Sequence, residues 1–403
     1  MKLLYTKKGL PVLFRHMDSA LVEMRYYVLC GPTNELSPNE HGLCHALEHT
    51  LFCGTGKRDY AEIKLAWDKL GTYYNAFTDY DHTAYVNTVL KKNWQESYEI
   101  LADMFYNATF PKERWEEIEK GAIISEIQRA QDNHAEQLQE AVYGDAFGES
   151  YHPILGNIKN IQKASVNDLK KFYEQQYCGN NVVFAIAGDL SETQVLRTLE
   201  RHDKIRKTAP VSINKIAFGF NASPIKMVRP VEQALISAVK PVPFSRNLRH
   251  RIALSLGLTC LEQFLFEELR EKRGLCYGVY VDIEDSIPNN LFLSLNTATD
   301  LERLTKMQKS LKSSLENFVE KGLTNTRIQC AKASESFTYA SRSEKVSSSV
   351  DVMWDGWKNQ IYSDPFDAHL SIMERLDNGT IRRTMTKALE GKLKIGTMTS
   401  GKD

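Results

Sequence analysis

The sequence of 403 residues lacks an excess of either charge. It holds 51 Lys and Arg residues against 51 Asp and Glu residues, so its formal net charge at pH 7 is zero. Proteins that bind nucleic acid generally need a basic surface that neutralises phosphates. The charge balance therefore disfavours nucleic acid as a partner of this chain.

Cysteine is also scarce, and long hydrophobic runs are missing. The seven cysteines are an odd number, lie far apart and form no CxxC pair, which predicts reduced and mostly buried thiols. The N-terminal residues lack both the apolar stretch of a secretion signal and the Arg- and Ser-rich composition of an organelle leader. No run approaches the roughly 18 apolar residues that a membrane span requires. These absences predict a cytoplasmic protein without membrane attachment.

What the sequence does have is the composition of a large globular protein. Hydrophobic residues make up 42% and charged residues 25%, and about 150 residues per domain allow two to three domains. Strand-like and helix-like segments follow the same order in both halves, without a residue-level repeat. We predict an α+β fold of two structurally similar α/β domains, each a mostly antiparallel sheet packed with helices. The domains are expected at residues 1–207 and 223–403, joined by a linker at 208–222.

Three predicted elements matter for function. The segment Ser37-Pro38-Asn39-Glu40 has the pattern of a capping box with Pro at the first helical position, which predicts a helix over 37–52. Residues 72–78 and 82–90 are both strand-like and predict a hairpin. A long helix is expected over 112–143.

The strongest chemical signal is the segment His45-Ala46-Leu47-Glu48-His49, in the first of these helices. Positions i, i+3 and i+4 of a helix share one face, so two imidazoles and one carboxylate come together. Neutral imidazoles bind Zn²⁺ well, and a catalytic zinc site uses three protein ligands and leaves the fourth position for water. The pattern therefore predicts part of a catalytic zinc site.

Two other interpretations compete with a metal site. An HxxEH pattern can arise by chance in a chain with ten His residues, and such a helix face can simply pack against the rest of the protein. Leucines on the opposite side of the helix, which can bury that side, favour the metal. The residues alone do not identify the third ligand, because the helix over 112–143 holds several carboxylates: Glu113, Glu116, Glu117, Glu119 and Glu126.

The stretch from Gly42 to Thr55, GLCHALEHTLFCGT, resembles the signature of the pitrilysin/insulinase family of zinc metallopeptidases. This family has HxxEH where thermolysin-like enzymes have HExxH. Smaller agreements at Gly31–Glu35, His152-Pro153 and Asn180–Asp189 extend the resemblance to essentially the whole chain. The chain is most similar to small two-domain members such as the subunits of mitochondrial processing peptidase and their bacterial relatives. The resemblance implies half of a clamshell whose second domain lacks the zinc motif.

The resemblance also implies roles for individual residues. His45 and His49 would bind one Zn²⁺ per chain, and Glu126, which lies 77 residues after His49, would be the third ligand. Glu48 would act as general base. Glu119, two helical turns before Glu126, would orient the metal-bound imidazoles from behind; a solvated surface charge is the alternative for this residue.

Two more segments resemble substrate-binding parts of the family. The first matches an edge strand beside the zinc, on which an extended peptide would pair through backbone hydrogen bonds; it consists of Asn75, Ala76, Phe77 and Thr78. An ordinary hairpin is the alternative for these residues. The second runs from Phe266 to Val279 and places Arg270 and Tyr277 at positions that hold the substrate backbone. Taken alone, this segment is a charged helix end with Gly274 as its C-cap.

Together these matches predict a zinc endopeptidase that acts on short or unfolded polypeptides held in extended form in an enclosed chamber. A processing peptidase specific for one precursor protein is one alternative, and a non-catalytic scaffold or peptide-binding subunit is another. Family members enclose their substrate between two such two-domain units. Because this chain has both the zinc motif and the Arg/Tyr segment, we expect a homodimer, with a heterodimer as the alternative.

Overall fold

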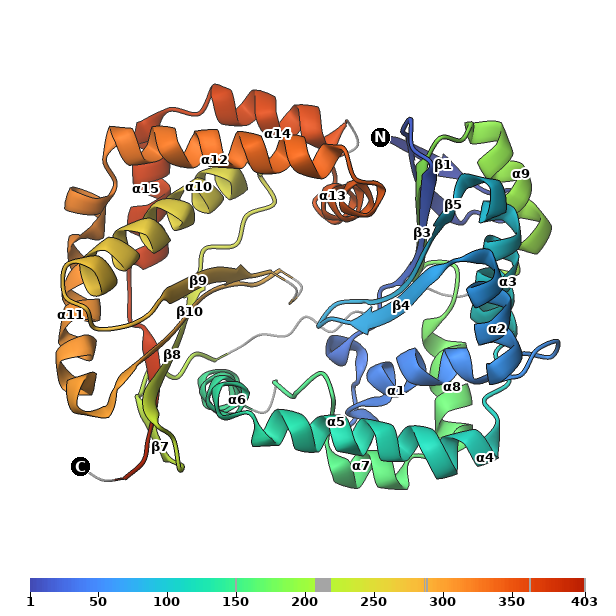
Figure 1. The fold of residues 1–403 in the computed structure, drawn as a ribbon, viewed down its shortest axis with the longest axis horizontal. Helices are drawn as coiled ribbons and strands as arrows, with labels where there is room; N and C mark the ends of the chain where they lie inside the picture. The colour runs from blue at the N-terminus through green and yellow to red at the C-terminus, as the bar shows by residue number, and fades with distance from the viewer. Residues whose placement is uncertain (149–150, 207–218, 286, 288, 362–363, 402–403) are drawn as a thin grey trace. The chain divides into compact units, whose positions relative to one another are not determined.

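The computed structural model describes residues 1–148, 151–206, 219–285, 287, 289–361 and 364–401 (Figure 1). These residues form two compact units, each built around one β-sheet. The first unit comprises the described residues within Met1–Gln128, His152–Asn214 and Ala340–Asp367, and the second comprises those within Arg129–Tyr151, Lys215–Tyr339 and Ala368–Asp403. The predicted domain boundary at 207 and most of the predicted linker at 208–222 lie outside the described residues.

The sheet of the first unit has six strands in the order β1-β2-β6-β3-β5-β4. Its strands are β1 (Lys2–Tyr5), β2 (Pro11–His16), β3 (Leu21–Val28), β4 (Tyr73–Thr78), β5 (Thr83–Leu90) and β6 (Val182–Gly188). Only β2 and β6 run parallel, and every other neighbouring pair is antiparallel. The strand β4, which holds the predicted substrate-binding residues, is at the edge of this sheet.

The second sheet repeats the topology of the first. Its order is β7-β11-β8-β10-β9, with strands β7 (Ile225–Val228), β8 (Gln233–Val242), β9 (Val279–Glu284), β10 (Leu291–Asp300) and β11 (Lys394–Thr399). Taken in sheet order, β7, β11, β8, β10 and β9 correspond to β2, β6, β3, β5 and β4 of the first sheet. The one parallel pair, β7 with β11, matches the pair β2 with β6. The predicted fold of two similar, mostly antiparallel α/β domains is confirmed.

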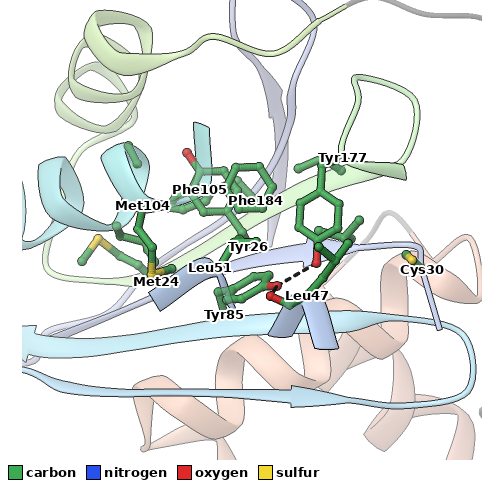
Figure 2. Packing of buried hydrophobic residues seen from close by; sticks show 14 of the residues in the cluster. Met24, Tyr26, Cys30, Leu47, Leu51, Tyr85, Met104, Phe105, Tyr177 and Phe184 are labelled. Carbon is green, nitrogen blue, oxygen red and sulfur yellow. Dashed lines mark hydrogen bonds between the residues drawn. The ribbon is translucent and has the colours of Figure 1, made fainter. Parts of the chain in front are cut away.

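Helices cover both faces of the first sheet. The main core lies between the sheet and the helices α1 (Leu43–Thr50), α3 (Trp94–Asn107) and α8 (Val166–Gln176). In this core Tyr26 of β3 stacks on Phe105 of α3, with ring centroids 4.1 Å apart (Figure 2). The unit also holds α2 (Tyr60–Leu70), α4 (Lys112–Arg114), α5 (Lys120–Asp132), α7 (Ile158–Lys163) and α9 (Glu192–His202).

The opposite face of the first sheet is covered by a helix from the last quarter of the chain, α13 (Val346–Lys358). Trp354 of this helix stacks on Tyr27 of β3 with ring centroids 4.0 Å apart. Arg25 of β3 donates a 2.5 Å hydrogen bond to Asp351. Aromatic packing and a partly buried ion pair thus fix α13 as part of the first unit.

In the second unit, a helix from the first half of the chain covers the sheet. This helix is α6 (His134–Phe147), which packs on β8 and β11. Gly396 of β11 makes this approach feasible, because a side chain there would collide with Val142 of α6. The fully buried Lys394 pairs with Asp145 of the same helix. The other helices of the unit are α10 (Leu248–Leu265), α11 (Leu304–Asn317), α12 (Asn325–Ser343), α14 (Pro365–Glu374) and α15 (Asn378–Leu389), of which α12 and α14 continue into the first unit.

Two predicted helices have different limits in the structure. The helix predicted over 37–52 is wrong at its start, because the Ser37 capping box caps only a short 3₁₀ turn, Pro38–Glu40. Gly42 then adopts φ +98°, outside the helical region, so α1 begins at Leu43. The single helix predicted over 112–143 is also wrong, since the chain turns at Asn133, whose side chain caps the start of α6.

Candidate metal and active site

The helix α1 presents His45, Glu48 and His49 on one face, as its periodicity requires. Each of the three offers a potential ligand atom, and these atoms all lie within 4.8 Å of one another. The two imidazole rings are 4.7 Å apart and nearly perpendicular, at 77°. His45 is buried and His49 is partly exposed.

Glu126 on α5 completes this arrangement. Its Oε2 atom lies 3.4 Å from Nε2 of His45 and 3.5 Å from Nε2 of His49. Two ligand atoms that bind a tetrahedral Zn²⁺ at about 2.0 to 2.15 Å are themselves about 3.3 to 3.5 Å apart. Both distances from the carboxylate oxygen to the imidazole nitrogens match this spacing, and the donor set of two imidazoles and one carboxylate fits zinc.

The two imidazoles differ in their affinity for protons. Burial lowers the pKa of His45 to about 4, and the neighbouring His49 adds to the effect. Burial also lowers the pKa of His49, but Glu119 and Glu126 outweigh this and raise it to about 9. His45 is therefore neutral at pH 7 and ready to bind a metal, whereas His49 must release a proton first.

The carboxylate of Glu48 is held by the edge strand. The Thr78 hydroxyl, at the end of β4, donates a 2.6 Å hydrogen bond to Oε2 of Glu48. Burial raises the pKa of Glu48, although the bond from Thr78 and the proximity of His49 oppose this. A carboxylate with a raised pKa beside a metal site suits a general base, because it accepts a proton more readily than an ordinary carboxylate. Its other oxygen is the one available for that proton.

Glu119 lies behind the imidazole of His49. Its Oε2 atom is 3.5 Å from Nδ1 of His49, and its Oε1 atom accepts a 2.7 Å hydrogen bond from Nε of Arg114. Burial alone would raise the pKa of Glu119, but these two partners lower it below its usual range. An ionised carboxylate at Nδ1 fixes the tautomer that leaves Nε2 free for a metal.

Sequence reasoning missed Arg114 and its partner Tyr60. The guanidinium of Arg114 lies 3.7 Å from the centre of the Tyr60 ring on α2, a cation–π contact that holds the arginine against Glu119. The segment between Arg114 and Lys120 is a π-helical turn, Trp115–Glu119. Such turns occur often at functional sites, and this one brings residues five apart in sequence together. The only signal in the sequence is that i, i+5 spacing.

A pocket of about 260 Å³ adjoins Glu48 and His49. Its walls come from α1, α2, β4 and the π-helical turn, and its remaining lining residues are Phe52, Tyr60, Ile63, Lys64, Tyr74, Asn75, Ala76, Arg114 and Glu119. Along β4 exposed and partly buried residues alternate, with Asn75 and Phe77 exposed. A free strand edge therefore runs directly beside the candidate metal site.

Buried hydroxyl groups keep α1 at a fixed position on the sheet. Tyr85 of β5 donates a 3.3 Å hydrogen bond to the carbonyl of Leu47, and its oxygen lies 2.7 Å from that of Tyr177 (Figure 2). The turn of α1 that carries Glu48 and His49 is thus tied to the core.

Arg270 and Tyr277 belong to the second unit, whereas the cluster on α1 belongs to the first. Tyr277 is 81% exposed, and the Arg270 guanidinium lies 4.2 Å from the centre of its ring. Arg270 also donates a hydrogen bond to the backbone carbonyl of Tyr277. The two side chains predicted to bind substrate form one exposed pair.

A second group of candidate ligands occurs at the β4–β5 turn and comprises Asp79, Asp81 and His82. Asp81 already contacts Nδ1 of His82 at 2.6 Å and Nζ of Lys358 at 3.5 Å. The ammonium group of Lys358 would oppose a cation there. These contacts indicate that the three residues attach the β4–β5 turn to α13 and do not form a metal site.

The comparisons with known proteins agree with the fold. Residues 12–155 match the profile of "Insulinase (Peptidase family M16)", and residues 163–335 match that of "Peptidase M16 inactive domain". The chain belongs to peptidase family M16, the insulinase family.

Relatives and solved structures extend this match. An uncharacterized zinc protease of Mycobacterium bovis is 29% identical over 304 residues, which cover 73% of this chain and 69% of that protein. The crystal structure of a peptidase M16 inactive domain from Pseudomonas fluorescens has a TM-score of 0.90 at 20% identity and covers 98% of this chain and 97% of that one. The periplasmic protease PqqL of Escherichia coli has a TM-score of 0.79 at 16% identity and covers 99% of this chain but 48% of that one.

Two further findings bear on the predictions of compartment. All seven cysteines lie in the described part of the chain and are free thiols, five of them buried. Among the described residues, no helix combines the length and the apolar character needed to cross a membrane.

Proposed function

We propose that this chain is a zinc-dependent endopeptidase that hydrolyses peptide bonds in short or unfolded polypeptides. The observation that carries the proposal is the spacing of 3.4 and 3.5 Å between Oε2 of Glu126 and Nε2 of His45 and His49. Glu48 lies beside these ligand atoms and is held by the edge strand β4. The names of the relatives, which are zinc proteases, support the choice of metal.

His45, His49 and Glu126 would hold the zinc ion, and Glu48 would move the protons. When bound, zinc would act as a Lewis acid that polarises the scissile carbonyl and lowers the pKa of a water molecule. Glu48 accepts a proton from that water at the oxygen that Thr78 does not engage, and then gives it to the leaving amine. Proton transfer by a positioned carboxylate typically contributes 10² to 10⁴ in rate.

The substrate would bind as an added strand along β4. An extended peptide can pair with the free backbone groups of an edge strand, which gives affinity with little dependence on sequence. Thr78 belongs to this strand and also bonds Glu48, so the strand that aligns the substrate backbone also sets the position of the base. The pocket beside Glu48 would then receive a substrate side chain next to the cleaved bond.

A quenched peptide library with and without a zinc chelator tests the proposal. We expect cleavage by the zinc-loaded chain, loss of cleavage with the chelator, and recovery when zinc is restored. Cleavage of many unrelated peptides would indicate a broad endopeptidase, and cleavage of one precursor alone would indicate a processing peptidase. A zinc-loaded chain that cleaves nothing, alone or with an added partner subunit, would contradict the proposal and favour a scaffold.

We also propose that the active form is a homodimer. This chain spans 48% of a similar single-chain protease, so a second copy would supply a matching second half. The exposed pair of Arg270 and Tyr277 would then serve the zinc site of the partner. A mixture of the Glu48→Gln and Tyr277→Ala variants tests this, because one of the two sites in a mixed dimer would have both residues intact. Recovery of activity on mixing is expected, whereas an active monomer by sedimentation would contradict the dimer.

A cytoplasmic location is the third part of the proposal. It rests on the seven free thiols, which a reducing compartment preserves. Cell fractionation, with thiol labelling of the protein as isolated, tests it. Recovery of the protein from the periplasm, where the similar protease PqqL is found, would contradict it.

A further inference from the structure

The helix that carries the candidate metal ligands has no cap of its own. The N-cap residue of α1 is Gly42, which has no side chain to accept hydrogen bonds from the amides of the first turn. These amides lack partners within the helix, so an uncapped first turn frays. His45 is the third residue of α1 and lies in that turn. Its position relative to Glu126 therefore depends on whatever satisfies these amides.

The carboxylate of Glu35 accepts hydrogen bonds from two amides at this end of the helix, from outside the helix. Its Oε2 atom accepts a 2.9 Å hydrogen bond from the amide of Gly42, and its Oε1 atom accepts a 2.8 Å bond from the amide of Cys44. The Glu35 side chain is fully buried. A negative charge at a helix N-terminus is also favoured by the helix dipole. The residue next to His45 is thus anchored by a carboxylate ten residues upstream of that histidine.

Glu35 is in turn held by His152, which returns to the first unit after α6. Nε2 of His152 lies 3.0 Å from Oε2 of Glu35, and its ring stacks on that of His41 with centroids 3.7 Å apart. The loop beyond it packs closely, since a Cβ atom on Gly156 would lie 2.6 Å from the carbonyl oxygen of His41. Neither contact reaches the metal ligands directly.

We propose that Glu35 is a positioning residue for the metal site and that His152 holds Glu35 in place. By fixing the first turn of α1, the pair keeps Nε2 of His45 at the distance from Glu126 that the metal requires. Neither residue contacts the metal or the substrate. This inference rests on the proposed zinc-binding function, but it concerns the affinity for the metal and the order of α1 rather than the hydrolysis itself.

Four variants of the full chain separate this role from simple stability. In Glu35→Gln one side-chain oxygen still accepts a hydrogen bond, but the other is replaced by an NH₂ group that faces a backbone N–H and cannot accept from it. His152→Ala removes the group that donates to Glu35. His152→Gln retains an N–H donor and serves as the conservative rescue. Glu40→Gln is the matched control, because Glu40 caps the neighbouring 3₁₀ turn and does not bond α1. The readouts are zinc affinity by competition with a chelator, amide hydrogen exchange of the metal-free chain and the melting temperature.

We expect Glu35→Gln to weaken zinc binding by about 10- to 100-fold, the range seen when groups that orient metal ligands are lost. His152→Ala should weaken it in the same direction, while His152→Gln and Glu40→Gln stay near wild type. The amide of Cys44 should exchange faster in the metal-free Glu35→Gln and His152→Ala variants. Unchanged zinc affinity in both variants, even with a lower melting temperature, would overturn the inference.

If Glu35→Gln does not fold, the comparison of His152→Ala with His152→Gln decides alone. A wild-type chain that binds no zinc would overturn both this inference and the proposed function. A wild-type chain that binds zinc without cleaving peptides would refute only the proposed function.

Discussion

The Thr78 hydroxyl on the edge strand β4 donates a 2.6 Å hydrogen bond to the Glu48 carboxylate on α1. This bond joins the strand on which we place the substrate to the group that we propose as the base. The same hydrogen bond therefore links the position of the proposed substrate-binding strand to the orientation of the proposed base.

Loss of this hydroxyl should impair turnover more than binding. In Thr78→Val the side chain keeps its shape but no longer orients Glu48, and we expect kcat to fall about tenfold, a part of the 10² to 10⁴ that a general base supplies. KM should change little, since peptide pairing uses the backbone of β4. Thr78→Ser retains the hydroxyl and should restore kcat. Steady-state kinetics decide, and a change confined to KM would contradict the role of Thr78.

The contact between Glu119 and His49 should set the affinity for zinc. In Glu119→Gln the charge that faces Nδ1 of His49 and the Arg114 guanidinium is lost, and we expect zinc to bind about 10- to 100-fold more weakly. Glu117→Gln, two residues away on the same π-helical turn and exposed, is the control. Chelator competition measures both variants. Equal affinities in the two would show that Glu119 does not orient His49 for the metal.

Zinc binding should strengthen as the pH rises. In the metal-free chain the pKa of His49 is raised to about 9 and that of His45 is lowered to about 4. Between these values His45 is neutral and His49 holds a proton that zinc must displace. The apparent affinity should therefore rise about tenfold per pH unit from pH 6 to pH 9 and level off above it. Calorimetry in buffers of different ionisation enthalpy counts the released proton, and no release at pH 7 would contradict this assignment.

The helix α13 should be needed for the first sheet and not for the second. Trp354→Ala removes the stack on Tyr27, and loss of a buried tryptophan typically costs about 3 to 5 kcal/mol. Amides of β3 and β6, which lie against α13, should then exchange faster. Those of β8 and β10 in the second unit should keep their protection. Equal losses in both sheets would show that α13 is not specific to the first unit.

The sequence allowed much of this site to be predicted because the helical period is local. The spacing of His45, Glu48 and His49 places them on one face of any helix, whatever surrounds it. The strand-like composition of residues 72–78 and 82–90 likewise indicated a hairpin. Glu126 could be singled out only through the family resemblance, since several carboxylates share its part of the chain.

Other features depend on contacts between distant parts of the chain. Glu35 was noted only as part of a family match, and its bonds to the α1 amides appear only once the loop is folded. The helix predicted over 37–52 is divided at Gly42, whose left-handed backbone separates the 3₁₀ turn from α1. The exchange of α6 and α13 between the two sheets has no periodic signature, because each helix packs against strands from the other half of the chain.

The most direct test of the account compares zinc content and peptide cleavage in the wild type and in Glu48→Gln. Glu48 lies within 4.8 Å of both histidines and is itself a potential ligand, so the experiment separates base from ligand. We predict one zinc ion per chain in both proteins and cleavage by the wild type alone. Loss of stoichiometric zinc from Glu48→Gln, or undiminished cleavage by it, would contradict the account.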